Sequence, residues 1–233
     1  MAVDIPPSIG DAAVMTDAAL AIEIEDDLAR VGVMPALQSR SRTLRDRLIQ
    51  VSLEIARKEA FDDVSIIDIC AAAGCSTGAF YSRFPDKITL FKAVMVFAAV
   101  ESRPLLETIV REAEFADILP RLVAAQVERY VRHATFFRSA FKVSLDAEQA
   151  WEPFRRNAYN LASTYLDRIF ALPGIERDKV NVERVRFAFQ VMYGVLNNTL
   201  INRPGPFVLE SDEFPVLLED AMMATMGLPL ARH

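Results

Sequence analysis

The stretch that decides the fold is residues 74–87, GCSTGAFYSRFPDK, where small polar residues precede three aromatic residues and a proline. Gly74 suits the left-handed position that ends a helix, and Ser76 is a preferred N-cap for the next one. Phe80 and Phe84 are four residues apart, so their side chains share one helical face. The pattern predicts a very short helix that is anchored by two phenyl rings and turns its other face outward.

The preceding segment predicts a partner for this short helix. Ser65 and Asp68 have the spacing of a capping box at the start of a helix over residues 65–73. The apolar residues of that helix recur at i, i+3, i+4 and i+7 as Ile66, Ile69, Cys70 and Ala73. Two short helices joined by AGCS form a helix-turn-helix. After Pro85, Asp86 is expected to cap a fourth helix over residues 87–100.

The rest of the chain predicts an all-α protein, because long segments with a 3.6-residue period are separated by few turn signals. The further helices are expected at 43–60, 118–143, 150–172, 179–202 and 212–226. Thr43 and Ser211 are expected to cap the first and the last of these helices. Pro104, Pro120 and Pro153 are expected at or near helix starts, where a missing N–H costs little.

Charge is distributed unevenly along the 233 residues. Residues 1–38 hold seven acids and one base, whereas residues 39–92 hold nine bases and seven acids. The basic segment points to a polyanionic partner although the whole chain has a net charge of −6. The acidic segment 1–40, loose over residues 1–13, is interpreted as either a frayed arm or one extra helix from Thr16.

Several functional classes are disfavoured. The longest clean apolar run, residues 93–100, is too short to span a membrane, and the N-terminus lacks the pattern of a secretory signal. With Cys70 and Cys75 as the two cysteines, no disulfide framework is expected, and the protein is interpreted as cytoplasmic. No catalytic motif, metal site or cofactor site is expected, because His133 is the one internal histidine and no phosphate loop is present.

The outward face of the short helix has the size and chemistry for a DNA major groove. Gly78 and Ala79 allow the backbone to approach closely, and the alanine methyl suits a thymine methyl. Thr77 and Tyr81 carry hydroxyls that suit phosphates. The alternative for Tyr81 is an aromatic at the edge of the core.

The residues around this turn match the sequence pattern of a known protein family. The stretch SIIDICAAAGCSTGAFYSRFPDKITLFKAV resembles the DNA-binding domain of the TetR family of bacterial transcriptional regulators, over about residues 42–97. The matching motifs are Ala73-Gly74-Cys75-Ser76 across the turn and Ala79-Phe80-Tyr81 followed by Phe84 and Lys87. The sequence departs from the family pattern at Thr77, where lysine is common, and at both cysteines, which replace alanine and valine.

The resemblance implies an N-terminal three-helix DNA-binding domain, here residues 41–97, followed by a larger helical effector-binding and dimerisation domain, residues 98–233. It implies that Thr77, Gly78, Ala79, Tyr81 and Ser82 face double-stranded operator DNA and that Tyr81 and Lys87 hold phosphates. Ser65, Arg42 and Arg45 would be flanking backbone contacts. The two arginines are equally interpreted as solvated charges.

The carboxy-terminal helices suggest two further features. Residues 179–202 are apolar nearly all round, so this helix and 212–226 are expected to form a homodimer seam, as the resemblance also implies. The middle helices are rich in aromatic residues, which favours a pocket for an apolar or aromatic small molecule. The residues expected to line that pocket are Phe137, Phe141, Trp151, Tyr165, Phe189 and Tyr193. Taken singly, each of them is more readily interpreted as core, because an aromatic residue at helical spacing is usually a core residue. Asn160, Gln190, Asn197 and Asn198 are polar residues that could orient a ligand there or lie exposed.

Two functions follow from these observations. The first is a repressor that a ligand releases from a palindromic operator. The second is a helical protein-interaction module that no longer binds DNA, which the acidic first 38 residues and the missing lysine at Thr77 leave open.

Overall fold

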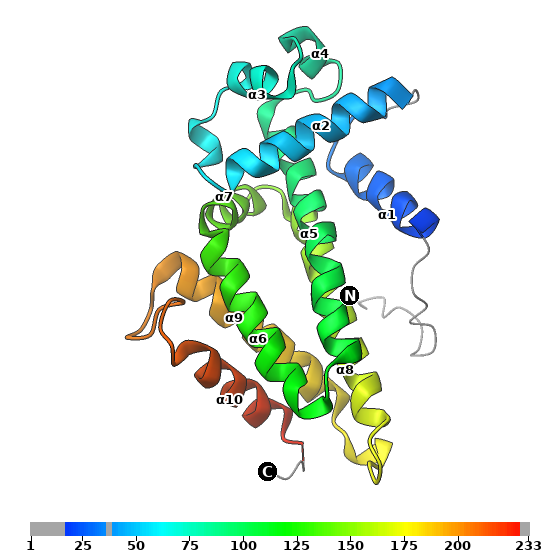
Figure 1. Ribbon diagram of the computed structural model, residues 1–233, viewed down its shortest axis with the longest axis vertical. Coiled ribbons are helices and arrows are strands. Elements are labelled where there is room, and N and C mark those ends of the chain that lie inside the picture. Colours follow the sequence, from blue (N-terminus) through cyan, green and yellow to red (C-terminus); the bar gives the residue numbers. More distant parts are fainter. Residues whose placement is uncertain (1–16, 36–38, 229–233) are drawn as a thin grey trace.

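The computed structural model describes residues 17–35 and 39–228, and every element in those ranges is a helix (Figure 1). The expected all-α fold is confirmed. The prediction of loose structure over residues 1–13 lies outside the described residues. Among the described residues, none of the helices combines the length and the apolarity needed to cross a bilayer.

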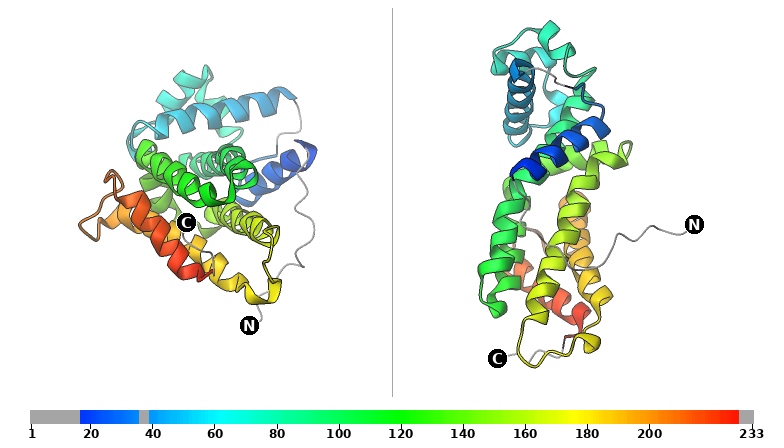
Figure 2. Two further views of the ribbon diagram at one scale, coloured as in Figure 1. Left: turned by 60° about the horizontal axis from the view of Figure 1, so that its bottom comes forward. Right: turned by 90° about the vertical axis from the view of Figure 1, so that its right-hand side faces the viewer.

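The molecule is elongated, with the helix-turn-helix at one end (Figure 2). This end contains α2 (Ser39–Ala56), the short η1 (Phe61–Asp63), α3 (Ile66–Ala73) and α4 (Thr77–Tyr81). The chain enters it through α1 (Asp17–Arg30) and leaves it through α5 (Lys87–Glu112). The remaining elements are α6 (Phe115–Arg132), α7 (Ala134–Ser144), η2 (Glu148–Trp151), α8 (Glu152–Phe170), η3 (Arg177–Lys179), α9 (Val182–Asn202) and α10 (Phe214–Met226).

Helix α5 connects the two ends of the molecule. It continues without interruption past Pro104 to Glu112. The expectation that this helix ends near residue 100 is therefore wrong, and so is the expectation that Pro104 lies near a helix start. At 26 residues and about 1.5 Å per residue, α5 is about 39 Å long. The lost N–H of Pro104 is outweighed because Leu106 and Val110, which follow it, are buried in the bundle.

Another helix boundary differs from the sequence-based expectations. The expected helix 118–143 is divided at His133, whose φ of −115° and ψ of 29° leave the helical region. This turn lets Phe136 and Phe137 of α7 reach the core, and Phe137 stacks on Tyr130 with ring centroids 4.2 Å apart. Pro120 therefore lies in the second turn of α6 rather than at a start.

The N-terminal caps of α2 and α10 also need correction. Thr43 lies one turn inside α2, and its Oγ1 donates to the carbonyl of Ser39 at 3.1 Å, which is a common mid-helix bond for threonine. Ser211 precedes the cap position of α10, and its hydroxyl accepts from the N–H of Val208 at 3.1 Å. The prediction for Pro153, in the first turn of α8, is confirmed.

Helix α1 is docked against α5, beside α2 (Figure 1). Leu28 is buried at its inner face, and the chain after it buries Val31 and Val33. Glu23 receives hydrogen bonds from Arg103 of α5 at 2.6 Å and from Arg156 of α8 at 3.0 Å. The acidic helix is therefore fixed by buried apolar contacts and by ion pairs with the bundle.

Candidate functional site

The turn between α3 and α4 is built by capping residues. Ser65 Oγ accepts from the N–H of Asp68 at 3.1 Å, and the Asp68 carboxylate accepts from the N–H of Ser65 at 3.3 Å. Gly74 has a φ of 65°, where a glycine avoids the strain of a side chain. Ser76 Oγ then accepts from the N–H of Ala79 at 3.2 Å and starts α4. These bonds fix the angle between the two helices and confirm the predicted helix-turn-helix.

Helix α4 is held from behind by aromatic rings. Phe80 and Phe84 are fully buried with ring centroids 5.8 Å apart. Tyr81 packs edge-on against Phe80 at 5.3 Å, yet 51% of it remains exposed. The ring therefore borders the core, as the alternative interpretation has it, while its outer part meets solvent, so its contact with a phosphate stays a prediction.

The face of α4 that points away from these rings is accessible. Thr77, Gly78 and Ser82 are exposed, and Ala79 is half-buried. The Ser82 hydroxyl donates to the carbonyl of Ala79 at 2.7 Å, and a guanidinium N–H of Arg83 donates to the Ser82 carbonyl at 3.0 Å. The residues expected to face DNA therefore share one small, rigid surface, and their contact with DNA stays a prediction.

The residues expected to contact the DNA backbone beside α4 lie in different environments. Ser65 is exposed at the start of α3, and Arg42 is exposed on α2, so both stay candidates for backbone contacts. Arg45 is 3% exposed, and its guanidinium donates to both carboxylate oxygens of Glu25 on α1 at 2.7 Å. The predicted DNA contact of Arg45 is therefore wrong, because the acidic helix already neutralises this buried charge. Hydrogen bonds to Glu25 and Asp46, which outweigh burial, raise the pKa of Arg45.

The side chain of Lys87 makes different contacts from those expected. Its ammonium donates to the carbonyls of Phe61, Asp62 and Val64 at 3.0, 2.9 and 2.8 Å. An ammonium has three N–H groups, so none remains for a phosphate in this conformation. The phosphate contact predicted for Lys87 is thus wrong for this state, and Lys87 instead joins the start of α5 to η1.

A Lys87→Met variant is expected to lose about 2 kcal/mol of unfolding free energy, because three carbonyls lose charged hydrogen bonds at a partly buried position. Urea denaturation measures this loss, and Lys58→Met, at an exposed position after α2, is the matched control. An unchanged midpoint together with a smaller salt dependence of DNA binding would show that Lys87 leaves these carbonyls to hold a phosphate.

The second part of the candidate site is a cavity of about 490 Å³ in the larger helical part. Helices α5, α6, α8 and α9 contribute its walls, with Ser102 and Leu106 from α5. The volume lies within the usual range for small-molecule sites, about 300–1,000 Å³. Its apolar walls are mainly aromatic, which agrees with the expected character of the pocket.

Half of the residues expected at the pocket line this cavity. Trp151, Phe189 and Tyr193 are on its walls, together with Gln190 and Asn197. The predictions for Phe137, Phe141 and Tyr165 are wrong, because these rings pack against other aromatic residues behind the wall: the respective partners are Tyr130, Trp151 and Phe115. Asn160 and Asn198 are likewise outside the wall.

The polar end of the cavity also contains residues of α6 that the sequence did not indicate. Tyr130 donates to Asn197 Oδ1 at 2.6 Å, and Gln126 Nε2 donates to the hydroxyl of Tyr193 at 2.7 Å. Arg129 also lines the cavity. Gln126, Arg129 and Tyr130 are spaced at i, i+3 and i+4, and this spacing could have indicated that they share one side of a helix. Burial raises the pKa of Tyr193 to about 12, so its hydroxyl stays neutral at physiological pH.

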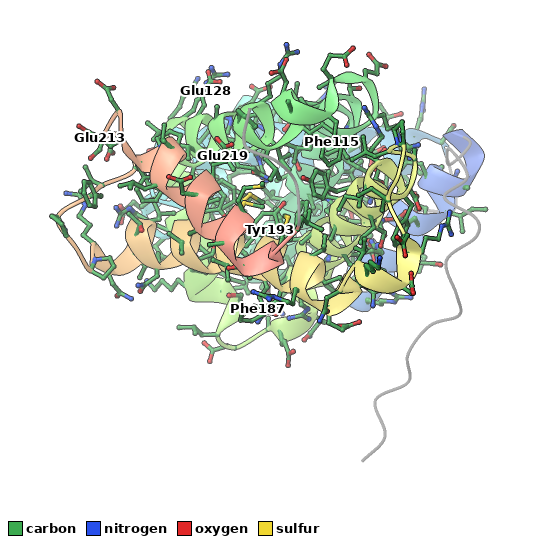
Figure 3. The ribbon with its side chains drawn as sticks, turned by 90° about the horizontal axis from the view of Figure 1, so that it is seen from below. Phe115, Glu128, Phe187, Tyr193, Glu213 and Glu219 are labelled. Carbon is green, nitrogen blue, oxygen red and sulfur yellow. The ribbon has the colours of Figure 1, made fainter. Side chains whose placement is uncertain are left out.

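Helix α9 presents two different faces. Val185, Phe189 and Met192 are buried in the bundle, so this half of the expected seam is internal to the protomer. Phe187 and Val195 lie on the opposite face, and Phe187 is 54% exposed. Exposed Leu217 and Val216 of α10 add to the apolar surface. Figure 3 shows Phe187 nearer the margin of the molecule and Tyr193 nearer its centre.

Comparison with known families agrees with this geometry. Residues 48–94 match the family model described as "Bacterial regulatory proteins, tetR family". The match covers the end of the molecule that holds the helix-turn-helix. None of the curated proteins compared with the chain matches it.

Solved structures extend the likeness along the chain. A TetR-family transcriptional regulator from Streptomyces coelicolor is 18% identical, with 79% of each chain covered and a TM-score of 0.58. A TetR transcriptional regulator from Rhodococcus sp. RHA1 is 18% identical, with 83% and 100% covered and a TM-score of 0.51. RolR in complex with resorcinol is 20% identical, with 82% and 90% covered and a TM-score of 0.58. At these identities the likeness shows the fold.

Residues 48–94 therefore form a helix-turn-helix domain that matches the model of the tetR family of bacterial regulatory proteins, and the helical bundle has a fold similar to that of solved TetR-family regulators. The chain thus has the N-terminal domain and the fold of the TetR family.

Proposed function

We propose that the protein is a homodimeric cytoplasmic repressor that binds a palindromic operator and is released when a small molecule occupies its cavity. The observation that carries this proposal is the outward face of α4. Its small and hydroxyl-bearing side chains are exposed, while the buried Phe80 and Phe84 prevent the helix from moving inward. A surface of this kind is suited to enter the major groove.

Two copies of this surface are needed to read a palindrome. The exposed apolar residues of α9 and α10 supply a seam for a second copy of the chain, in which the same patch meets itself across a two-fold axis. Such a dimer holds two recognition helices about 34–36 Å apart, which is one turn of B-DNA.

Helix α5 supplies the connection between cavity and DNA. Ser102 and Leu106 of this helix line the cavity, and its N-cap Asp86 lies a few residues beyond α4. RolR, whose fold is similar, was solved with resorcinol bound. A ligand that moves α5 would change the separation of the two α4 helices, and a coupling of about 1–3 kcal/mol gives a 5- to 150-fold change in affinity.

The proposal is tested by selecting duplexes from a random pool with the purified full-length protein and measuring their affinity by fluorescence anisotropy. Enrichment of a palindrome is the expected result. No enrichment, and no binding to the upstream region of the protein's own gene at low salt, would favour the protein-interaction module. Turnover of a substrate would contradict a purely regulatory role.

Gly78→Ala is expected to change stability and DNA affinity in opposite directions. The added Cβ would meet nothing closer than Ser76 Oγ at 3.8 Å, so the helix accepts it. Alanine in place of glycine stabilises a helix by about 0.5–1 kcal/mol. The same methyl group stands on the surface facing DNA, and we expect operator affinity to fall at least about tenfold, a loss of about 1.4 kcal/mol.

The matched control is Ala124→Gly, the reverse change at an exposed position of α6. It should lower stability and leave operator affinity unchanged. If Gly78→Ala is as stable as expected and binds the operator normally, α4 does not approach the bases as proposed.

A further inference from the structure

The cavity is bordered by three arginines with different surroundings. Arg155 is paired with Glu148 at 3.4 Å and with Glu152 at 2.9 Å. Arg186 is paired with Glu183 at 2.9 Å. Arg129 has no ion pair with a carboxylate in the described part of the chain. The positive charge of Arg129 is therefore the one that the cavity wall leaves without a counter-ion.

The guanidinium of Arg129 is held in place without being neutralised. Its Cζ lies 4.9 Å from the centroid of the Phe137 ring, and one N–H donates to Gln126 Oε1 at 3.0 Å. A guanidinium has five N–H donors, so this arrangement fixes its plane and leaves further donors for a ligand. Burial lowers the pKa of Arg129, which reflects the cost of keeping a charge in this place.

The other charged groups near Arg129 do not compensate for it. The charge of Glu101 on α5 favours the charged form of Arg129, but Glu101 is itself paired with Arg57. On α6 itself, Glu128 is paired with Arg132. Burial and then the surrounding arginines lower the pKa of His133, which follows α6, so its neutral form is favoured and it adds no second positive charge. The C-terminal end of α6 offsets part of the charge through its dipole.

Neutral hydrogen-bonding groups accompany this arginine. The hydroxyls of Tyr130 and Tyr193 and the side chain of Asn197 line the same cavity as Arg129. Aromatic rings form another part of the wall, where Trp151 and Phe154 stack with centroids 4.7 Å apart. One cavity thus combines a fixed cation, neutral donors and acceptors, and stacked rings.

We propose that the effector is an aromatic carboxylate whose carboxylate group pairs with Arg129 while its ring system stacks among the aromatic residues of the cavity. The proposal rests on the proposed function in taking this cavity as the effector site. A carboxylate matches the guanidinium with two parallel hydrogen bonds, which is the strong form of this interaction. A neutral phenol would leave the charge uncompensated, and an ammonium would be repelled by it.

The test uses isothermal titration calorimetry on the full-length protein with three matched pairs: benzoate and benzamide, 3-phenylpropanoate and its amide, and 2-naphthoate and 2-naphthamide. At least one acid should bind more than tenfold more tightly than its amide. Arg129→Gln should weaken that acid at least tenfold and the amide less than threefold, and Arg129→Lys should recover part of the loss.

Arg155→Gln is the matched control, since it removes a cavity arginine that already has carboxylate partners, and it should change acid binding less than threefold. Thermal unfolding verifies that each variant folds. The proposal is overturned if no acid binds at 1 mM, if acids and amides bind equally, or if Arg155→Gln costs as much as Arg129→Gln.

DNA binding separates this proposal from the regulator function. The ligand-free Arg129→Gln protein should bind the selected duplex like the unaltered protein, because α4 is far along α5 from the cavity. If acids bind through Arg129 but no duplex is ever bound, the repressor function fails and the ligand assignment remains. If the duplex is bound and Arg129 makes no difference to acids, the ligand assignment fails alone.

Discussion

A Phe187→Arg variant is expected to be a folded monomer with at least a 100-fold weaker affinity for the full operator. Phe187 is 54% exposed on the apolar face of α9, so the substitution costs little within one protomer. Across a two-fold seam it places two guanidinium groups in an interface that otherwise excludes water. Loss of the dimer also removes the gain from binding two half-sites together, which is about 10²–10⁴ in avidity.

Analytical ultracentrifugation at micromolar concentration gives the oligomeric state, and fluorescence anisotropy compares the full palindrome with a single half-site. The variant should bind both duplexes equally weakly. Leu145→Arg, an exposed leucine just after α7, is the matched control and should stay dimeric. A folded Phe187→Arg protein that remains a dimer would place the seam on another surface.

A Glu23→Gln variant is expected to lower the unfolding free energy by roughly 3 kcal/mol. Glu23 is paired with Arg103 at 2.6 Å and with Arg156 at 2.7 Å. Arg156 has a second carboxylate partner in Asp27, so the main effect is expected at Arg103, which is 9% exposed. Removing one partner of a buried ion pair typically costs about 3–5 kcal/mol because the other charge is left buried. We expect a loss of free energy at the lower end of that range, because the side chains of both ion pairs keep some contact with solvent.

The same ion pairs predict the pH dependence. Burial by itself would raise the pKa of Glu23, but the hydrogen bonds and charges of Arg103 and Arg156 outweigh it and lower the pKa below 4.5. A carboxylate with a depressed folded-state pKa stabilises the fold above its unfolded pKa and loses this effect as the pH falls through the folded value. The stability difference between the two proteins should therefore be full at pH 7 and should disappear as the pH falls through the lowered folded-state pKa of Glu23.

Asp26→Asn is the matched control, since Asp26 is exposed on the same helix. It should change the unfolding free energy by less than about 0.5 kcal/mol, as surface substitutions usually do. An equal effect of the two substitutions, measured by urea denaturation at pH 7, would show that α1 is not held by these ion pairs.

The helix-turn-helix was predictable because its signals are local. Ser65, Gly74 and Ser76 act on groups within a few residues, so their spacing alone defines where α3 ends and α4 begins. The ends of longer helices were not predictable in this way. Pro104 is a poor interior residue by local propensity, yet burial of later apolar residues keeps α5 helical, and this balance depends on helices far away in the sequence.

The roles of charged residues depended still more on tertiary contacts. Arg45 and Lys87 have the sequence positions of phosphate contacts, but α1 and η1 supply nearby oxygen atoms that no local pattern indicates. The aromatic residues of the middle helices were identifiable as a group. Which ring reaches the cavity and which stacks behind it depends on helix rotation, so Trp151 and Phe141 could not be separated from the sequence.

The unbroken course of α5 past Pro104 has a mechanical consequence. Ser102, in the cavity wall, and Lys87, at the start of α5, are fifteen residues apart on one helix, which is about 23 Å at 1.5 Å per residue. A tilt of about 5° at the cavity would therefore swing the far end by about 2 Å, which is several times the roughly 0.5 Å range of a normal N–H···O hydrogen-bond distance. If a ligand in the cavity moves α5 as we propose, the helix would act as a lever arm, and a slight local adjustment by the ligand would be enough to shift the far end.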